Sequence, residues 1–242
     1  MRKHGRLLLI TISCIALLSF SMIPKQHPTQ SGDNTLSAAE KKAGWKMLFD
    51  GKSTDGWRPY KNKPSDGWEV VNGEIHCKEQ GVQHRADLIT KEKYGDFELS
   101  LDWKVGKAAN SGIIYLANEE HDASYESGPE YQLIDDNGYP DKLEDWQKSG
   151  SYYAMYPPAR LVSKPAGEYN HTVIKVKGKH VEHWLNGVKV VDFESGTPEW
   201  FALKEKSKWK DIKDWGQAKE GYICLQDHGG GVWFRNIKIR KL

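Results

Sequence analysis

The residues with the clearest chemical potential lie in segment 130–135, which places an acid, an amide and a second acid within one apparent strand. Side chains alternate between the two faces of a strand, so Glu130 and Gln132 would share a face. Asp135 would join them only if a β-bulge added one residue before it. Two carboxylates would then face one groove, as in enzymes that use acid/base chemistry on sugars. The alternative is a strand with a solvated polar face.

A second group of candidate residues surrounds His228, which stands in a Gln-Asp-His-Gly sequence followed by two further glycines. Glycine lets the backbone approach a ligand closely, and histidine side chains titrate near neutral pH, as a proton shuttle should. The alternative role of His228 is that of a turn residue at a strand end, with Asp227 accepting hydrogen bonds from the turn amides. Neutral groups suited to sugar hydroxyls are present in Asn110, Ser111, Gln132 and Tyr153.

From residue 45 onward the chain has the pattern of short β-strands joined by turns. Residues 97–103 alternate between apolar and polar side chains, and the Asn-Gly pairs at 72–73 and 186–187 are strong hairpin signals. We therefore predict an all-β fold, an antiparallel sandwich or barrel with long loops and at most one short helix. The predicted strands cover residues 68–76 (two runs around the first Asn-Gly turn), 97–103, 112–116, 172–177, 180–185, 188–193, 221–226 and 232–240.

Two long segments interrupt this pattern of short strands and turns. Residues 137–164 are rich in Tyr, Pro and Gly, and residues 198–216 are rich in Lys, with Trp209, Ile212 and Trp215 at intervals of three. The second segment is compatible with a short amphipathic helix or with an irregular lid. Long loops in a compact domain tend to be functional.

The N-terminus has the pattern of an export signal. Arg2, Lys3 and Arg6 precede an apolar run without charges from residue 7 to residue 23, which predicts a signal peptide over residues 1–21. Cys14 offers a lipoprotein signal as an alternative, and an uncleaved membrane anchor is a third. The polar residues that follow predict a flexible tether over 22–42 and a sandwich domain over 43–242. We expect an exported protein, periplasmic or on the cell surface.

Charge and cysteine content limit the remaining function classes. Loss of three positive charges with the signal peptide would change the formal net charge from +2 to about −1, which gives no electrostatic basis for binding nucleic acid or an anionic membrane. Cys77 and Cys224 would remain, either paired in an oxidising compartment or as two buried thiols. No Cys/His spacing indicates a zinc site, and we expect neither a metal nor a cofactor.

The chain resembles the 3-keto-disaccharide hydrolase domain family, formerly DUF1080, over residues 45–242. The family has a concanavalin A-like lectin/glucanase sandwich, so the resemblance implies a jelly roll. One departure is Tyr169, where the family usually has Trp. Nine segments carry the resemblance in register, at residues 48–57, 94–99, 110–115, 130–135, 149–153, 165–170, 184–187, 225–229 and 234–237.

The resemblance implies an enzyme whose substrate, a carbohydrate, already carries a ketone at C3. The ketone acidifies the proton at C2, and the glycosidic oxygen leaves from C1, so a base and an acid suffice for elimination, after which water can add. We expect three catalytic residues, with Glu130 as the leading acid/base, His228 as its partner and Asp135 orienting or assisting them. The expected substrate-binding residues are Gln132, Asn110, Ser111, Tyr153, Asp227 and Arg85, the last as a group that could polarise the keto oxygen.

Segment 130–135 also resembles the active-site strand of retaining β-glucanases on the same kind of sandwich, where the pattern is Glu-x-Asp-x-x-Glu with a bulge before the last acid. Here Gln132 stands at the central position. A neutral amide cannot perturb neighbouring carboxylates as an anion does, which argues against an ordinary nucleophile/acid pair. Two alternatives to the keto-sugar enzyme are a non-catalytic carbohydrate-binding module, since fold does not fix function, and an ordinary glycoside hydrolase.

Overall fold

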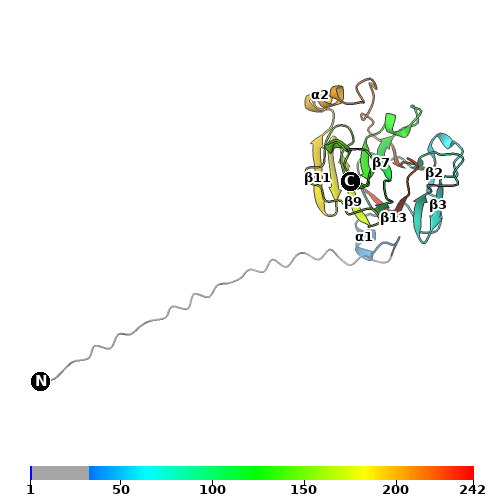
Figure 1. The fold of residues 1–242 in the computed structure, drawn as a ribbon, viewed down its shortest axis with the longest axis horizontal. Helices are drawn as coiled ribbons and strands as arrows, with labels where there is room; N and C mark the ends of the chain where they lie inside the picture. The colour runs from blue at the N-terminus through cyan, green and yellow to red at the C-terminus, as the bar shows by residue number, and fades with distance from the viewer. Residues whose placement is uncertain (2–32) are drawn as a thin grey trace. The chain divides into compact units, whose positions relative to one another are not determined.

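Two antiparallel β-sheets pack face to face in the computed structural model, which describes Met1 and residues 33–242 (Figure 1). The predicted all-β sandwich is confirmed. The predicted signal peptide, apart from Met1, and the tether up to residue 32 lie outside the described residues.

The larger sheet has eight strands in the order β11-β10-β9-β6-β13-β4-β3, with β1 paired to β13. Its long central strands bring segments far apart in the sequence side by side, since β6 lies between β9 and β13. The strands are β1 (Lys46–Met47), β3 (Trp68–Val71), β4 (Glu74–Cys77), β6 (Phe97–Val105), β9 (Asn170–Lys177), β10 (His180–Leu185), β11 (Val188–Glu194) and β13 (Val232–Lys241).

The smaller sheet has five strands in the order β2-β5-β12-β7-β8, so β8 lies at one edge. All of its pairs are antiparallel. The strands are β2 (Trp57–Pro59), β5 (Leu88–Thr90), β7 (Asn110–Ala117), β8 (Glu130–Ile134) and β12 (Tyr222–Leu225).

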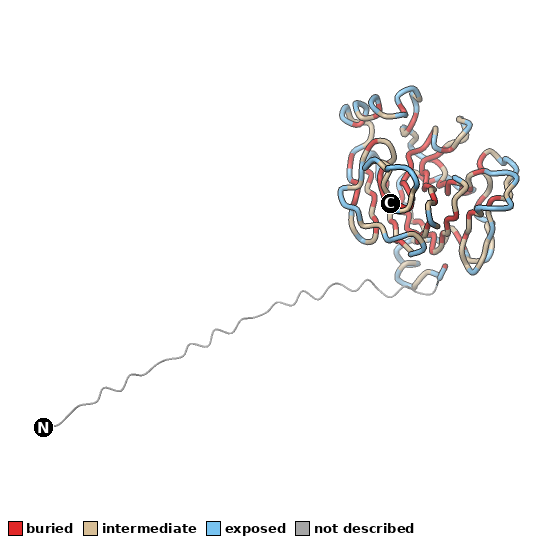
Figure 2. Tube along the Cα trace, in the orientation of Figure 1, coloured by how far each residue is buried: buried red, intermediate tan, exposed pale blue. Residues whose placement is uncertain are grey.

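The core fills the space between the two sheets, where Figure 2 shows buried residues along the strands. Phe97, Leu99 and Trp103 alternate along β6 and are fully buried, as the period-2 pattern predicts. Tyr115 and Tyr131 of the smaller sheet belong to the same apolar cluster. One face of each sheet is therefore used for the core.

Turns and helices connect these strands. Asn72 and Asn186 each have a positive φ and precede a glycine with a positive φ, as the two predicted hairpins require. There are two α-helices among the described residues instead of at most one: α1 (Ala38–Lys42) and α2 (Pro198–Lys206). Three short 3₁₀ helices lie between α1 and α2: η1 (Tyr60–Asn62), η2 (Ser124–Glu126) and η3 (Asp145–Gln147).

The folded domain begins before residue 43, within the range expected to be a tether. Ser37 and Glu40 form a capping box at the start of α1. The Asn34 backbone N–H donates to Asn236 Oδ1 at 2.6 Å, and the Asn236 N–H donates back to Asn34 Oδ1 at 2.9 Å. These bonds fasten residues from 34 onward to β13.

Within the described part of the chain, no helix has both the length and the apolar character to cross a bilayer.

Cys77 and Cys224 are buried and form no disulfide, so the alternative of two buried thiols is confirmed.

Candidate active site

The candidate site is built on the face of the smaller sheet that points away from the core. Along β8, Tyr131 and Leu133 enter the core, so the alternation of side chains turns Glu130 and Gln132 to the opposite face. In the pairing with β7, Gln132 lies across from Gly112. The absence of a side chain at Gly112 leaves room for the Glu130 carboxyl group, since a Cβ at this position would lie 2.4 Å from Glu130 Oε1.

The outer edge of β8 is covered by a loop. The Gln132 N–H donates to Ser151 O at 3.2 Å, the Gly150 N–H donates to Gln132 O at 2.9 Å, and the Tyr153 N–H donates to Glu130 O at 3.0 Å. This pairing satisfies backbone groups of an edge strand and places Tyr153 beside Glu130.

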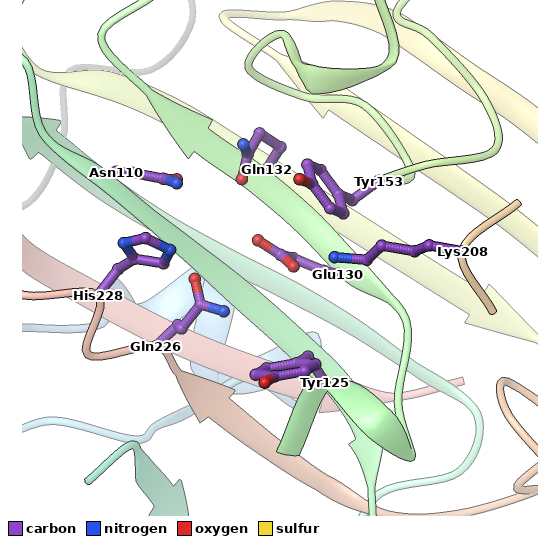
Figure 3. Close-up of a pocket in the computed structure, with 8 residues that line it drawn as sticks. All are labelled: Asn110, Tyr125, Glu130, Gln132, Tyr153, Lys208, Gln226 and His228. Atoms are coloured by element: carbon purple, nitrogen blue, oxygen red, sulfur yellow. The ribbon is translucent and has the colours of Figure 1, made fainter. Parts of the chain in front are cut away.

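A pocket of about 200 Å³ lies above β7 and β8 (Figure 3). The volume is below the ~300–1,000 Å³ of pockets for drug-sized ligands, which suits a ligand such as a single sugar ring. Its lining comes from six separate segments of the chain: Asn110, Tyr125, Glu130, Gln132, Tyr153, Lys208, Gln226 and His228.

Glu130 is the one carboxylic acid among these lining residues. The residue is 5 % exposed, and burial raises the pKa of its carboxyl group from 4.5 to about 8, although the positive charge of Lys208 acts in the opposite direction. Within the described residues, the Glu130 carboxyl group forms no hydrogen bond. At neutral pH it therefore carries a proton and can donate it to a ligand in the pocket.

Three amide side chains present unpaired oxygens in the pocket. Asn110 Oδ1, Gln132 Oε1 and Gln226 Oε1 are buried and have no hydrogen-bond partner among the described residues. An unpaired buried acceptor costs about 1–3 kcal/mol, so a ligand that donates to these oxygens would recover this energy. Hydroxyl groups of a sugar are suitable donors.

His228 reaches the pocket from the loop after β12. Gly229 in this loop has a φ of +82°, and a Cβ at Gly230 would lie 2.9 Å from Ala109 Cβ. Both glycines are therefore needed for the loop to press against the start of β7. No described residue forms a hydrogen bond with the His228 imidazole, which leaves both ring nitrogens available to a ligand.

Asp135 does not line the pocket, and the predicted bulge is wrong. Pairing of β7 and β8 runs without a register shift from Glu130 to Ile134. The Asp135 carboxylate instead accepts hydrogen bonds from the backbone N–H groups of Ala108 at 2.9 Å and Gly138 at 2.9 Å. Free amides of the adjoining turns therefore draw this side chain away from Glu130.

Ser111, Asp227 and Arg85 lie beside the pocket instead of in its lining. Ser111 Oγ donates to Gln226 O at 2.8 Å. Arg85 Nη1 lies 2.7 Å from Asp227 Oδ1, and the same oxygen accepts a hydrogen bond from the Gly229 N–H at 3.1 Å. These three predicted binding residues instead hold the backbone that carries Gln226 and His228.

Five of the nine predicted site residues line the pocket, and three lining residues were not predicted. Gln226 lies in a segment that carries the family resemblance, and Lys208 lies in the long Lys-rich segment. The family resemblance and the Lys-rich composition of these two segments could therefore have indicated Gln226 and Lys208. No pattern in the sequence distinguishes Tyr125, which comes from η2.

Comparison with known proteins identifies the family. Residues 44–240 match the model of the 3-keto-alpha-glucoside-1,2-lyase-like domain. The chain belongs to this family. It is 36% identical to a 3-keto-disaccharide hydrolase of Bacteroides thetaiotaomicron, over 82% of this chain and 79% of that protein. The predicted family is thus confirmed, and with it an enzyme of the glycoside-cleaving hydrolase type.

Solved structures support the same fold. A protein of Parabacteroides distasonis named "putative glycosyl hydrolase" is 40% identical, with a TM-score of 0.82 over 87% of this chain and 100% of that one. A second protein of that organism with the same name is 28% identical, with a TM-score of 0.58 over 77% of this chain and 99% of that one.

Gly112 gives a direct test of how Glu130 is positioned. A Cβ at Gly112 would lie 2.4 Å from Glu130 Oε1 and 2.7 Å from Glu130 Cγ, so the carboxyl group of a Gly112→Ala variant must move. We expect a roughly 10- to 100-fold lower kcat on a 3-keto-disaccharide, since a shift of about 1 Å can cost this much. Gly106→Ala is the control, because its added methyl would approach no atom closer than 3.4 Å. Wild-type turnover of Gly112→Ala would contradict the assigned position of Glu130.

Proposed function

We propose that this enzyme cleaves the glycosidic bond of 3-keto-disaccharides by removal of the C2 proton, elimination across C1–C2 and addition of water. One observation carries the proposal: the pocket lining contains a single carboxylic acid, Glu130. Ordinary glycosidases of most families use two, about 5–5.5 Å apart when they retain the anomeric configuration and about 6.5–9.5 Å apart when they invert it. A mechanism that needs one carboxylic acid and one base fits this lining better.

The 3-keto group makes such a mechanism possible. A base takes the proton from C2, and the bond electrons form a C2=C3 double bond while the carbonyl electrons move to the oxygen as an enolate. The enolate electrons then return, a C1=C2 double bond forms and the C1–O bond breaks, with the leaving oxygen taking a proton from an acid. Water adds its hydroxyl to C1 and its hydrogen to C2, so the net change is hydrolysis.

Two lining residues supply the proton transfers. Glu130 is the acid for the leaving oxygen, because burial raises its pKa to about 8 and the group holds a proton at neutral pH. His228 is the base at C2, since its imidazole lines the same pocket and is not held by another described residue. The two side chains approach the pocket from different segments, Glu130 from β8 and His228 from the loop after β12 (Figure 3).

The names of the relatives agree with a two-stage reaction. The curated relative is named a hydrolase, and the family model describes a lyase-like domain. Elimination is the lyase half of the reaction, and the addition of water completes hydrolysis. The same first step thus accounts for both names.

A comparison of two substrates tests the proposal. Purified protein is incubated with a disaccharide and with the same disaccharide oxidised at C3, and free sugar is measured. We expect release from the 3-keto compound alone. Equal release from both would indicate an ordinary glycoside hydrolase, and binding of both without release would indicate a carbohydrate-binding module.

We propose in addition that the enzyme is exported. The support is the basic and apolar pattern of residues 1–23. Mass spectrometry of the mature protein after cell fractionation is the test. A periplasmic or surface protein that has lost about 20 N-terminal residues is expected, and lipidation would instead leave Cys14 as the first residue. A cytoplasmic protein with an intact N-terminus would contradict export.

A further inference from the structure

Lys208 is the one lysine among the residues that line the pocket, and the lining contains no arginine. Lys208 follows α2, and Figure 3 shows its side chain extending into the pocket toward Glu130. No described residue forms a hydrogen bond or ion pair with its ammonium group. Lys208 Nζ instead lies 4.3 Å from the ring centroids of Tyr153 and Trp209 and 5.8 Å from that of Tyr125. The aromatic faces hold the ammonium group without using its hydrogen-bond donors.

The backbone that carries Lys208 is fixed by stacked indole rings. Trp209 and Trp215 stack at a centroid distance of 4.7 Å, and Trp200 of α2 stacks on Trp215 at 6.1 Å. Trp215 Nε1 donates to Tyr125 O at 2.8 Å, and Trp209 Nε1 donates to Tyr153 O at 3.3 Å. Lys208 is an exposed residue as a whole, yet its backbone is anchored to the same residues whose rings guide its ammonium group.

The charge of Lys208 has no permanent anion to neutralise in the pocket. Partial removal from water lowers the pKa of Lys208, while the nearby Glu130 acts to raise it. Glu130 itself holds a proton at neutral pH, so it does not provide a full negative charge. A cation placed in this way stabilises a negative charge that develops during a reaction, because its position needs little rearrangement.

We propose that Lys208 donates a hydrogen bond to the C3 keto oxygen of the substrate, stabilises the enolate oxygen that forms when the C2 proton leaves, and thereby selects a ketone over a hydroxyl at C3. The inference rests on the elimination proposed above. No proton is transferred from Lys208: the carbonyl electrons move to the oxygen as the C2–H bond breaks and return when the C1–O bond breaks. In this scheme Glu130 serves the oxygen on C1 and Lys208 serves the oxygen on C3, the two carbons that flank C2.

Exchange of the C2 proton in D₂O measures the step that Lys208 assists. With a 3-keto-disaccharide, we expect Lys208→Met to lower both the exchange rate and kcat/KM roughly 100-fold, a typical effect of removing one donor to a developing oxyanion. Lys208→Arg keeps the charge and should recover part of the loss. Lys210→Met removes an exposed lysine from the same segment and should behave as wild type.

Lys208→Met should also shift the alkaline limb of the pH profile of kcat to higher pH. The reason is that the positive charge of Lys208 lowers the pKa of Glu130 in the wild type. If only this limb moves, while C2 exchange and maximal turnover stay at wild-type values, Lys208 merely adjusts Glu130 and the inference is overturned. Failure of the proposed function has a different signature: the wild-type enzyme itself would show no C2 exchange and no preference for the 3-keto substrate.

Discussion

Glu130→Gln is expected to lower kcat on a 3-keto-disaccharide by roughly 1,000-fold, within the range of about 10²–10⁴ that a positioned general acid contributes. The amide has almost the same shape as the acid, so the substrate should still bind, but it cannot give a proton to the leaving oxygen. Steady-state kinetics and a binding titration with the same substrate separate the two effects. A variant that turns over at the wild-type rate would exclude Glu130 from the mechanism.

The same substitution should increase stability at high pH. The folded-state pKa of Glu130 is raised from 4.5 to about 8, so the native protein binds this proton more tightly than the unfolded chain. Wild-type stability therefore falls as the pH rises from about 4.5 to about 8 and is constant above that. Glu130→Gln removes this dependence, and its advantage above pH 8 should be on the order of a few kcal/mol, at about 1.4 kcal/mol per pKa unit. Urea unfolding of both proteins at pH 5 and pH 8.5 measures this difference in the free energy of unfolding.

Asp135→Asn provides the matched control, since Asp135 is also a buried acid near β8. Its carboxylate accepts hydrogen bonds from the Ala108 and Gly138 N–H groups, and an amide cannot accept at both oxygen positions. We expect a loss of about 1–3 kcal/mol in the free energy of unfolding and turnover within a few-fold of wild type. Loss of turnover in a folded Asp135→Asn protein would place this residue back in the mechanism.

His228→Asn is expected to lower kcat by roughly 100-fold or more, because no other lining residue offers an imidazole to take the C2 proton. Its effect differs from that of Glu130→Gln in the step that it blocks. Exchange of the C2 proton in D₂O should be lost in His228→Asn and retained in Glu130→Gln, whose defect comes after proton removal.

His84→Asn is the control for this experiment, because His84 is exposed and lies outside the pocket lining. Its exchange and turnover should equal those of the wild type. If Glu130→Gln loses C2 exchange while His228→Asn keeps it, the two residues have the opposite roles, with Glu130 as the base.

Local patterns in the sequence predicted much of the fold. Alternation of apolar residues along 97–103 and the Asn-Gly pairs at 72–73 and 186–187 act over a few residues, and the structure has the strands and hairpins that they indicate. The same alternation correctly puts Glu130 and Gln132 on one face of β8. Period-2 patterns are informative because one face of each sheet must be buried.

The failures concern contacts that depend on distant parts of the chain. Asn110 and Ser111 are neighbours in β7 and point to opposite faces, so both could not line one pocket, and only the packed sheet decides between them. The bulge expected before Asp135 rests on an analogy with β-glucanases, whereas in the structure the Asp135 carboxylate accepts hydrogen bonds from the backbone N–H groups of Ala108 and Gly138 in the adjoining turns. Lys208 depends on where α2 ends and on the stacking of Trp209 and Trp215.

The loop that pairs with the outer edge of β8 joins two properties that could otherwise evolve separately. An uncovered edge strand is a template for pairing with another chain and hence for aggregation. Here Gly150 and Ser151 block such pairing. Tyr153, two residues further along the same loop, forms part of the pocket wall. Mutations that loosen this loop should therefore reduce solubility and substrate affinity together, so selection for either trait protects the other.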